Sequence, residues 1–158
     1  MAGELTLILD EKDYAYVQAQ LTKLTELEKN AVVQKGLQEG VRIFQKEGKR
    51  TLKSTLSKKP VNVVMRQKIA EKRGGSLMQS IGTKVLKKKG KGYAGFGKYG
   101  HHAHLVDSGT VDRWTSKGQY RGKVHGSRFW RTAFNNKKSE AIRELIDSIR
   151  KSIEKIAK

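Results

Sequence analysis

The sequence of 158 residues contains no cysteine and only one proline, Pro60. The lack of cysteine excludes disulfide bonds and thiolate metal sites. No apolar run approaches the ~20 residues that a membrane-spanning helix requires, and the N-terminus lacks the basic segment and long apolar core of a signal peptide. We therefore expect a soluble chain, synthesised in the cytoplasm without membrane contact, whose length fits one domain over residues 1–158.

Acidic residues are scarce in the middle of the chain. Residues 48–138 hold twenty-three Lys and Arg against three acids, a net charge of +20, whereas residues 1–47 sum to −2 and residues 139–158 to +1. The overall net charge of +19 therefore belongs to the middle of the sequence. Such a region attracts a polyanion or an acidic protein surface, and composition alone does not distinguish the two.

The first part of the chain, about residues 1–57, has the apolar spacing of a short strand followed by two helices. Leucines alternate over residues 4–10, which predicts a strand with one buried face. Spacing of three and four residues predicts one helix from about Glu11 and a second over about residues 30–56. The glycines in the second helix either weaken it or allow another helix to approach closely. They are Gly36, Gly40 and Gly48.

The basic middle of the chain, about residues 74–126, is predicted to be rich in β structure. Alternation and Lys/Gly turns predict strands over about residues 76–97. Residues 103–110 fit a short strand or a helix ending in a turn, and we interpret them as the end of a core strand. The flanking segments are predicted as loops. They are residues 57–75, which could hold a strand or short helix, and residues 113–127, which are polar.

The last part, about residues 127–158, begins with an aromatic segment that we expect to dock on the fold. Apolar residues then recur at +3, +4, +7, +11 and +14 from Ile142, with charged residues between them. This spacing predicts an amphipathic helix of about 20 residues, capped by Ser139. The order of elements predicts an α+β fold, in which two N-terminal helices and a long C-terminal helix pack on a small antiparallel sheet.

Three of the four histidines, His101, His102 and His104, are close in sequence. With His125 or Asp107 they could supply metal ligands. Only His102 and His104 could easily share an ion, because neighbours in an extended segment point to opposite faces, and no motif such as HExxH is present. The basic region also lacks the acids that a metal-dependent nuclease would use. We expect no metal, no cofactor and no enzymatic activity.

The stretch KKKGKGYAGFGKYG, residues 87–100, mixes lysines with aromatic residues at every third position. Lysines neutralise phosphates and aromatic rings stack on bases, so this stretch could bind nucleic acid without sequence preference. The alternative is a hairpin with aromatic core contacts and solvated lysines. The aromatic residues are Tyr93, Phe96 and Tyr99, and the candidate contacts with DNA or an acidic partner are Lys87, Lys88, Lys89, Lys91 and Lys98.

Three short motifs follow one another in the second half of the chain: GSLMQSI (75–81), HLVDSGT (104–110) and RFWRTA (128–133). This series, followed by a long amphipathic helix, resembles the small neck proteins of long-tailed bacteriophages, the head–tail joining or tail-completion family of the lambda minor tail protein Z type. The resemblance covers about residues 70–158. The chain departs from the family pattern at Asp107, where Glu is more frequent, and in having no proline before Phe129.

The resemblance implies a structural virion protein that forms a ring of six copies at the junction between capsid connector and tail. The implied partners are other copies of the chain, connector or stopper proteins, tail-terminator or tail-tube proteins, and phage DNA passing through the lumen. The implied location is the phage neck. The residues assigned to a subunit interface or turn are Leu105, Val106, Asp107, Gly109, Thr110, Arg113, Arg128, Phe129 and Trp130.

Asp107 and Gly109 have a specific expectation at this turn. Glycine provides the backbone freedom that the turn requires. The carboxylate of Asp107 is expected either to pair with Arg113 or Arg121 of the same or a neighbouring subunit, or to form a local Asx turn with Gly109. Two other functions stay open from the sequence: a free-standing, non-specific nucleic-acid-binding protein and a metal-dependent nuclease.

Overall fold

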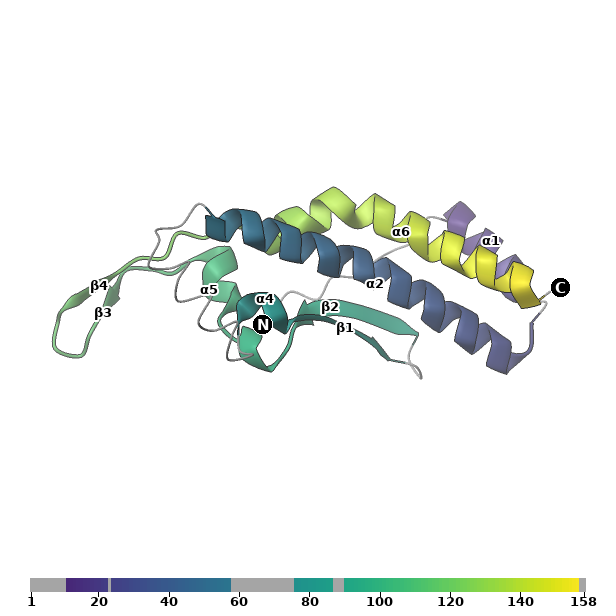
Figure 1. The fold of residues 1–158 in the computed structure, drawn as a ribbon, viewed down its shortest axis with the longest axis horizontal. Coiled ribbons are helices and arrows are strands. Elements are labelled where there is room, and N and C mark those ends of the chain that lie inside the picture. The colour runs from purple at the N-terminus through teal and green to yellow at the C-terminus, as the bar shows by residue number, and fades with distance from the viewer. Residues whose placement is uncertain (1–10, 23, 58–75, 87–89, 157–158) are drawn as a thin grey trace. The chain divides into compact units, whose positions relative to one another are not determined.

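The computed structural model describes residues 11–22, 24–57, 76–86 and 90–156. It consists mainly of helices, with two small two-stranded sheets that pair β1 with β2 and, in antiparallel fashion, β3 with β4. The predicted α+β class, with N-terminal helices and a long C-terminal helix, is confirmed. In chain order the elements are α1 (Glu11–Leu21), α2 (Glu26–Ser57), α4 (Leu77–Ser80), β1 (Ile81–Leu86), β2 (Lys91–Phe96), η2 (Lys98–Gly100), α5 (Ala103–Ser108), β3 (Arg113–Trp114), β4 (Tyr120–Gly122) and α6 (Phe129–Ile156) (Figure 1).

The chain divides into two compact units that alternate along the sequence. Among the described residues, unit 1 comprises 47–57, 76–82 and 95–135, and unit 2 comprises the remainder. Both long helices, α2 and α6, contribute residues to each unit, so one domain over 1–158 stays a prediction. The strand expected over residues 4–10 and the loop expected over residues 58–75 lie outside the described residues.

Unit 2 is built from α1, the longer parts of α2 and α6, and most of β1 and β2. The first turn of α2 is closed by a reciprocal pair of contacts, because Thr25 N donates to the Glu28 carboxylate at 2.9 Å and Glu28 N donates back to Thr25 Oγ1 at 3.4 Å. The three helices bury one apolar cluster, as their amphipathic spacing predicts. The buried members of this cluster are Val17, Val32, Leu145, Ile146 and Ile149.

Two glycines of α2 explain how closely α6 packs in unit 2. A Cβ atom at Gly36 would lie 2.7 Å from Cγ1 of Ile149, and one at Gly40 would lie 3.1 Å from the carbonyl oxygen of Ala141. Real Cβ atoms do not approach other atoms so closely without a shift of the neighbour. Of the two interpretations of these glycines, close helix approach is therefore the one that the packing supports.

Unit 1 has its own core, into which several chain segments each contribute a side chain. Its short helix α4 begins with a capping box, in which the Ser76 hydroxyl accepts from Gln79 N at 3.1 Å and the Gln79 side chain accepts from Ser76 N at 3.2 Å. Phe129 is the largest side chain in the core and has no exposed surface. The buried members of this cluster are Leu52, Leu77, Ile81, Ala103 and Phe129.

Three predictions about the secondary structure are wrong. Residues 103–108 form helix α5 rather than the end of a core strand; Ala103 is its buried residue, and the helix ends at Gly109. The polar loop over 113–127 contains the β3–β4 hairpin. The C-terminal helix has 28 residues and begins at Phe129, so Ser139 lies inside it as an exposed residue rather than at its cap.

Candidate functional site

The second and third of the three motifs, residues 104–110 and 128–133, meet at one place, which we call the α5–α6 junction and define as residues 106–110 and 124–130. Asp107 connects its two sides. Its carbonyl oxygen accepts from Arg128 N at 2.8 Å, and its carboxylate Oδ1 accepts from Trp130 N at 2.8 Å. Because Trp130 is the second residue of α6, this carboxylate satisfies one of the free N–H groups at the helix start and lies at the positive end of the helix dipole.

Within one chain this contact replaces both expectations for Asp107, and a pair with an arginine of a neighbouring subunit stays a prediction. Within the chain its carboxylate caps α6 and makes neither an ion pair with Arg113 or Arg121 nor an Asx turn with Gly109. The guanidinium of Arg113 instead donates to the carbonyl oxygens of Gly122 and Arg121, at 3.3 and 3.4 Å. The capping side chain is 23 positions away from Trp130 in the sequence. A prediction from neighbouring residues therefore placed the cap at Ser139 instead.

Gly109 makes the sharp turn that ends α5. It has a φ of +85°, and its N–H donates to the carbonyl of Leu105 at 3.0 Å. A Cβ atom here would lie 2.6 Å from both Gly126 N and the carbonyl oxygen of Val124. These neighbours are backbone atoms, so they cannot move aside as a side chain could. The position therefore requires glycine both for its conformation and for the close approach of a second backbone segment.

Further bonds hold the second side of the junction. Thr110 N donates to Val124 O at 2.9 Å, and Val124 N donates to Thr110 Oγ1 at 3.0 Å. The carbonyl oxygen of Val106 accepts from both the N–H and the hydroxyl of Ser127, at 3.0 and 2.9 Å. The two segments of the junction are thus bonded to one another at several points, and these bonds fix where α6 begins.

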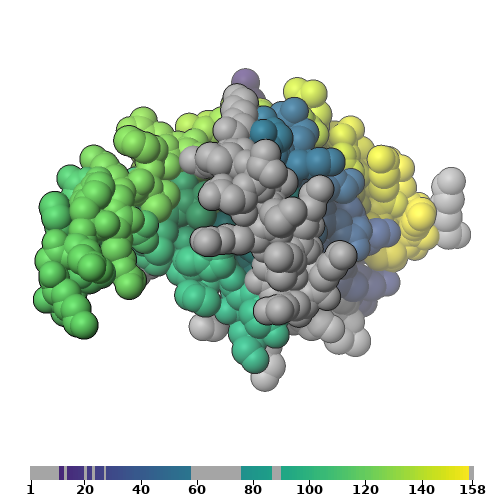
Figure 2. Space-filling view, turned by 60° about the vertical axis from the view of Figure 1, so that its left-hand side comes forward, coloured from purple at the N-terminus to yellow at the C-terminus, as the bar shows by residue number. Residues whose placement is uncertain are grey.

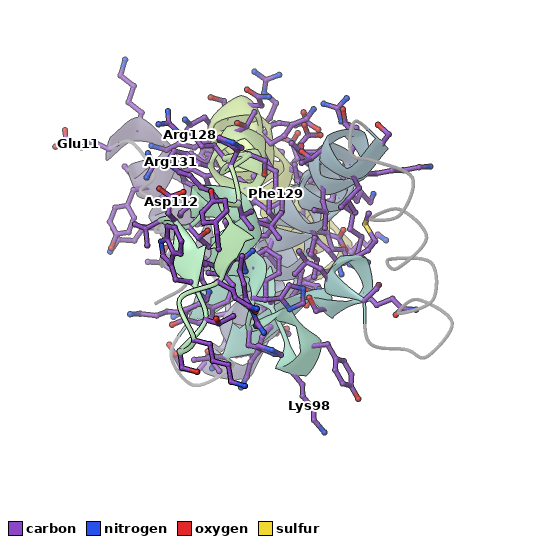
Figure 3. All side chains as sticks on the ribbon, turned by 90° about the vertical axis from the view of Figure 1, so that its left-hand side faces the viewer. Glu11, Lys98, Asp112, Arg128, Phe129 and Arg131 are labelled. Carbon is purple, nitrogen blue, oxygen red and sulfur yellow. The ribbon has the colours of Figure 1, made fainter. Side chains whose placement is uncertain are left out.

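The accessibility of the assigned interface residues divides them into three groups: buried, half-buried and exposed. Phe129 lies among packed side chains (Figure 3) and has no surface with which to contact another subunit, so it serves the core of unit 1. The apolar residues Leu105, Val106 and Trp130 are half-buried. Arg113 and Arg128 are exposed and available to a partner.

The stretch of residues 87–100 differs from the expected surface of lysines and aromatic residues. Lys98 extends away from unit 1 (Figure 3), and its ammonium lies 5.7 Å from the ring centroid of Tyr99, which is also exposed. Phe96, in contrast, packs on Phe129 and Trp130, with ring centroids 6.0 and 4.9 Å apart. The three aromatic residues of this stretch therefore do not form one exposed stacking face. Lys91 is exposed, and Lys87, Lys88 and Lys89 lie outside the described residues.

The β3–β4 ribbon, residues 111–125, is the feature that the sequence analysis missed. It projects from unit 1 (Figure 1) and belongs to the green lobe at the left of Figure 2. Trp114 and Tyr120 are partners in its register, and their rings lie 4.9 Å apart while remaining 63% and 55% exposed. The signal in the sequence was WTSKGQY, in which two aromatic residues flank a turn that contains Gly118.

The histidines do not form a metal site in the described part of the chain. His104 Nδ1 lies 2.9 Å from the carbonyl oxygen of His101, and the rings of His101 and His102 are 5.3 Å apart. Burial, followed by the nearby charges of His101 and His104, lowers the pKa of His102. No three His, Asp or Glu residues among those described are grouped so that they could hold an ion.

Comparison with known proteins gives no relative of this chain: no family model, curated protein or solved structure matches it. None of the helices that the structure describes is long and apolar enough to cross a membrane. Any statement about function therefore depends on the residues and contacts given above.

Proposed function

We propose that this chain is a structural subunit of the neck of a tailed bacteriophage, where it forms a ring that joins or completes the tail around the DNA channel. One observation carries the proposal: the three ordered motifs of the resemblance converge on one framework. Leu77, Ile81 and Phe129 belong to the same core, and Asp107 ties the second motif to the third. A chance Gly-Thr turn would explain one motif, whereas a shared framework explains all three.

The distribution of charge also suits a ring. In a closed head-to-tail ring, each subunit must present two different surfaces that fit one another. The described residues of unit 1 hold ten Lys and Arg against three acids, and those of unit 2 hold thirteen against nine. A subunit with one strongly cationic part and one mixed part has the asymmetry that such an interface needs.

The cations also suit a channel for DNA. Lysine and arginine hold phosphates without reading sequence, and the contacts exchange readily, so DNA can slide past them. Lys91 and Lys98 are exposed, and on this proposal they face the DNA or an acidic neighbouring ring. The function requires no chemical step, and the chain acts by being held between other proteins.

Assembly is the direct test. We expect the purified chain to form rings visible by electron microscopy, either alone or when mixed with connectors and tails encoded beside its gene. Arg128→Glu, an exposed change at the junction, should prevent assembly, whereas Lys53→Glu, the same charge reversal on an exposed face of α2, should not. A folded monomer that never joins connectors or tails would refute the proposal.

A free-standing, non-specific nucleic-acid-binding protein is the second candidate, favoured by the net charge of +20 over residues 48–138. It predicts DNA affinity that falls steeply with salt. The two candidates are separated by reversing charge at Lys87, Lys88 and Lys89 together. Loss of DNA binding with unchanged assembly into particles would favour the second candidate, and loss of assembly would favour the first.

A further inference from the structure

The β3–β4 ribbon is a small projection with a hydrogen-bonded turn. Its turn is closed by three bonds: Thr115 N donates to Gln119 O at 2.8 Å, Gly118 N donates to Thr115 O at 3.0 Å, and Gln119 N donates to Thr115 Oγ1 at 3.0 Å. Gly118 has a φ of +75°, which glycine adopts without strain. The side chains on the ribbon are therefore presented on a hydrogen-bonded backbone, and none of them belongs to the buried cluster of unit 1.

Large apolar surface is concentrated on this projection. Trp114 and Tyr120 have most of their surface exposed, and Val111, at the base of the ribbon, is 81% exposed. The two rings are inclined at 57° and contact one another, while each keeps more than half of its surface exposed to solvent. Adjacent aromatic residues that project into water from a ribbon are typical of a surface that contacts a partner.

The charges around the aromatic pair define the chemistry of that partner. Residues 111–125 carry four Lys and Arg against one acid, Asp112. The Asp112 carboxylate accepts from the Tyr120 hydroxyl at 2.9 Å. The four cations are all exposed, and they lie on both strands and in the turn. They are Arg113, Lys117, Arg121 and Lys123.

We propose that the β3–β4 ribbon is a nucleic-acid-binding element, whose cations bind phosphates and whose Trp114 ring stacks on bases. An acidic protein surface would match the cations, but it does not require an exposed indole beside them. Nucleotides match both features, because each carries a phosphate and a flat base. In a duplex the base faces are hidden, so a duplex binds the ribbon through its cations alone, and a strand with exposed bases binds more tightly.

This inference deepens the proposed neck function and rests on it for the identity of the nucleic acid as phage DNA. It assigns DNA contact to the ribbon, in addition to the lysine-rich stretch of residues 87–98. Binding by the ribbon is a property of the isolated chain and can be measured without assembly. Failure of the ribbon to bind and failure of the chain to assemble are therefore separate results.

Tryptophan fluorescence tests the stacking contact directly. The chain has two tryptophans, so Trp130→Phe leaves Trp114 as the only indole. We expect an oligothymidine of about 20 nucleotides to quench its emission strongly, and a duplex of similar length to quench it weakly. Polyglutamate is the probe for an acidic protein partner. Quenching by polyglutamate and not by the oligothymidine would overturn the proposal in favour of a protein partner.

Binding of a labelled oligothymidine, followed by anisotropy in the otherwise unchanged chain, is the second measurement, and it does not depend on the folding of the Trp130→Phe variant. Trp114→Ala should weaken binding on the order of tenfold, and the affinity for duplex should change much less. Equal affinity of the unchanged chain and the Trp114→Ala variant for the single strand would overturn the stacking contact.

The cations are tested with a matched pair of double variants. Arg121→Gln with Lys123→Gln removes two charges from the ribbon, and Lys53→Gln with Lys138→Gln removes two exposed charges from the helices. The ribbon pair should weaken binding and make the slope of log affinity against log salt shallower by about 1.4. Equal slopes for the two double variants would mean that the ribbon holds no phosphates. Assembly into rings by ribbon variants that no longer bind DNA would leave the neck function standing.

Discussion

In the sequence the β3–β4 ribbon lies between the two segments of the α5–α6 junction and shares residues 124 and 125 with it, but the two features are built in opposite ways. The junction is held by bonds between two backbone segments, and the buried Phe129 follows it directly. The ribbon is bonded mainly to itself and carries its largest side chains, Trp114 and Tyr120, in solvent. The motif residues therefore stabilise the fold of unit 1, whereas the exposed aromatic and charged side chains lie between two motifs.

This contrast indicates which residues of this chain are suited to contact a binding partner. A residue such as Phe129 fits a motif because many segments pack on it, and its burial removes it from any interface. Trp114 fits no motif, and nothing in the fold of unit 1 requires its exposed surface. The same kind of substitution should thus affect stability at the junction and binding at the ribbon.

Truncation of the two aromatic side chains should give the largest difference. Phe129→Ala removes a fully buried ring and should lower the free energy of unfolding by about 3–5 kcal/mol. Trp114→Ala removes a ring that is 63% exposed and should change it by less than about 0.5 kcal/mol. Denaturant unfolding followed by circular dichroism measures both. Similar losses for the two variants would show that the ribbon is packed as firmly as the core.

Two glycines with positive φ sharpen the same contrast. Gly109→Ala strains the backbone and drives a Cβ atom to 2.6 Å from two backbone atoms, so it should cost about 2–4 kcal/mol. Gly118→Ala has a similar strain at a φ of +75° but meets nothing within 4 Å, and should cost about 1 kcal/mol. Thermal unfolding of the two variants isolates the effect of the close approach. Equal costs would mean that the junction can open to admit the methyl group.

Two aspartates provide a third pair. Asp107→Ala removes the cap of α6 and leaves Trp130 N without its acceptor, which should cost about 1–2 kcal/mol. Asp112→Ala removes an exposed bond to the Tyr120 hydroxyl and should cost less than about 0.5 kcal/mol. Asp107→Asn retains an oxygen acceptor and should recover part of the loss. No recovery with Asn, measured by chemical denaturation, would assign the effect to the charge at the helix end.

The sequence predicted the elements that depend on local periodicity and missed those that depend on distant contacts. Repeats of three and four residues marked the helical stretch from Ile142, and alternation with a Lys/Gly turn marked β1 and β2. Residues 103–108 are too few for a period of two to be separated from one of 3.6. Burial of Ala103 against other segments decides the helix, and this burial has no local signal.

The start of α6 and the role of its cap could not be read locally either. The polar run NNKKS, residues 135–139, has the composition of a helix start. Phe129, Trp130 and Ala133 nevertheless have helical spacing, and the acceptor that allows the helix to begin there belongs to Asp107, in another motif. The exposed pair Trp114 and Tyr120 was visible as a symmetric arrangement about a Gly turn, but only the register brings the two rings together.

The smallest expected effect compares two histidines, His102 next to α5 and His125 at the base of the ribbon. Burial, and then the charges of His101 and His104, lower the pKa of His102 in the folded chain. The unfolded chain therefore takes up this proton at a higher pH than the folded chain does. Stability associated with neutral His102 is present above the ordinary pKa of about 6.5 and is lost as the pH falls through the lower folded-state value.

His102→Gln should consequently flatten the fall in unfolding free energy between about pH 7 and pH 5, the range in which histidine titrates. His125→Gln, a change of an exposed side chain, should leave that fall as it is. Denaturant midpoints measured across this range for the two variants and the unchanged chain make the comparison. A flattening by His125→Gln alone would place the pH-sensitive contact at the base of the ribbon. The ribbon would then contribute to the stability of unit 1. The contrast between a stabilising junction and a ribbon that serves binding would not hold.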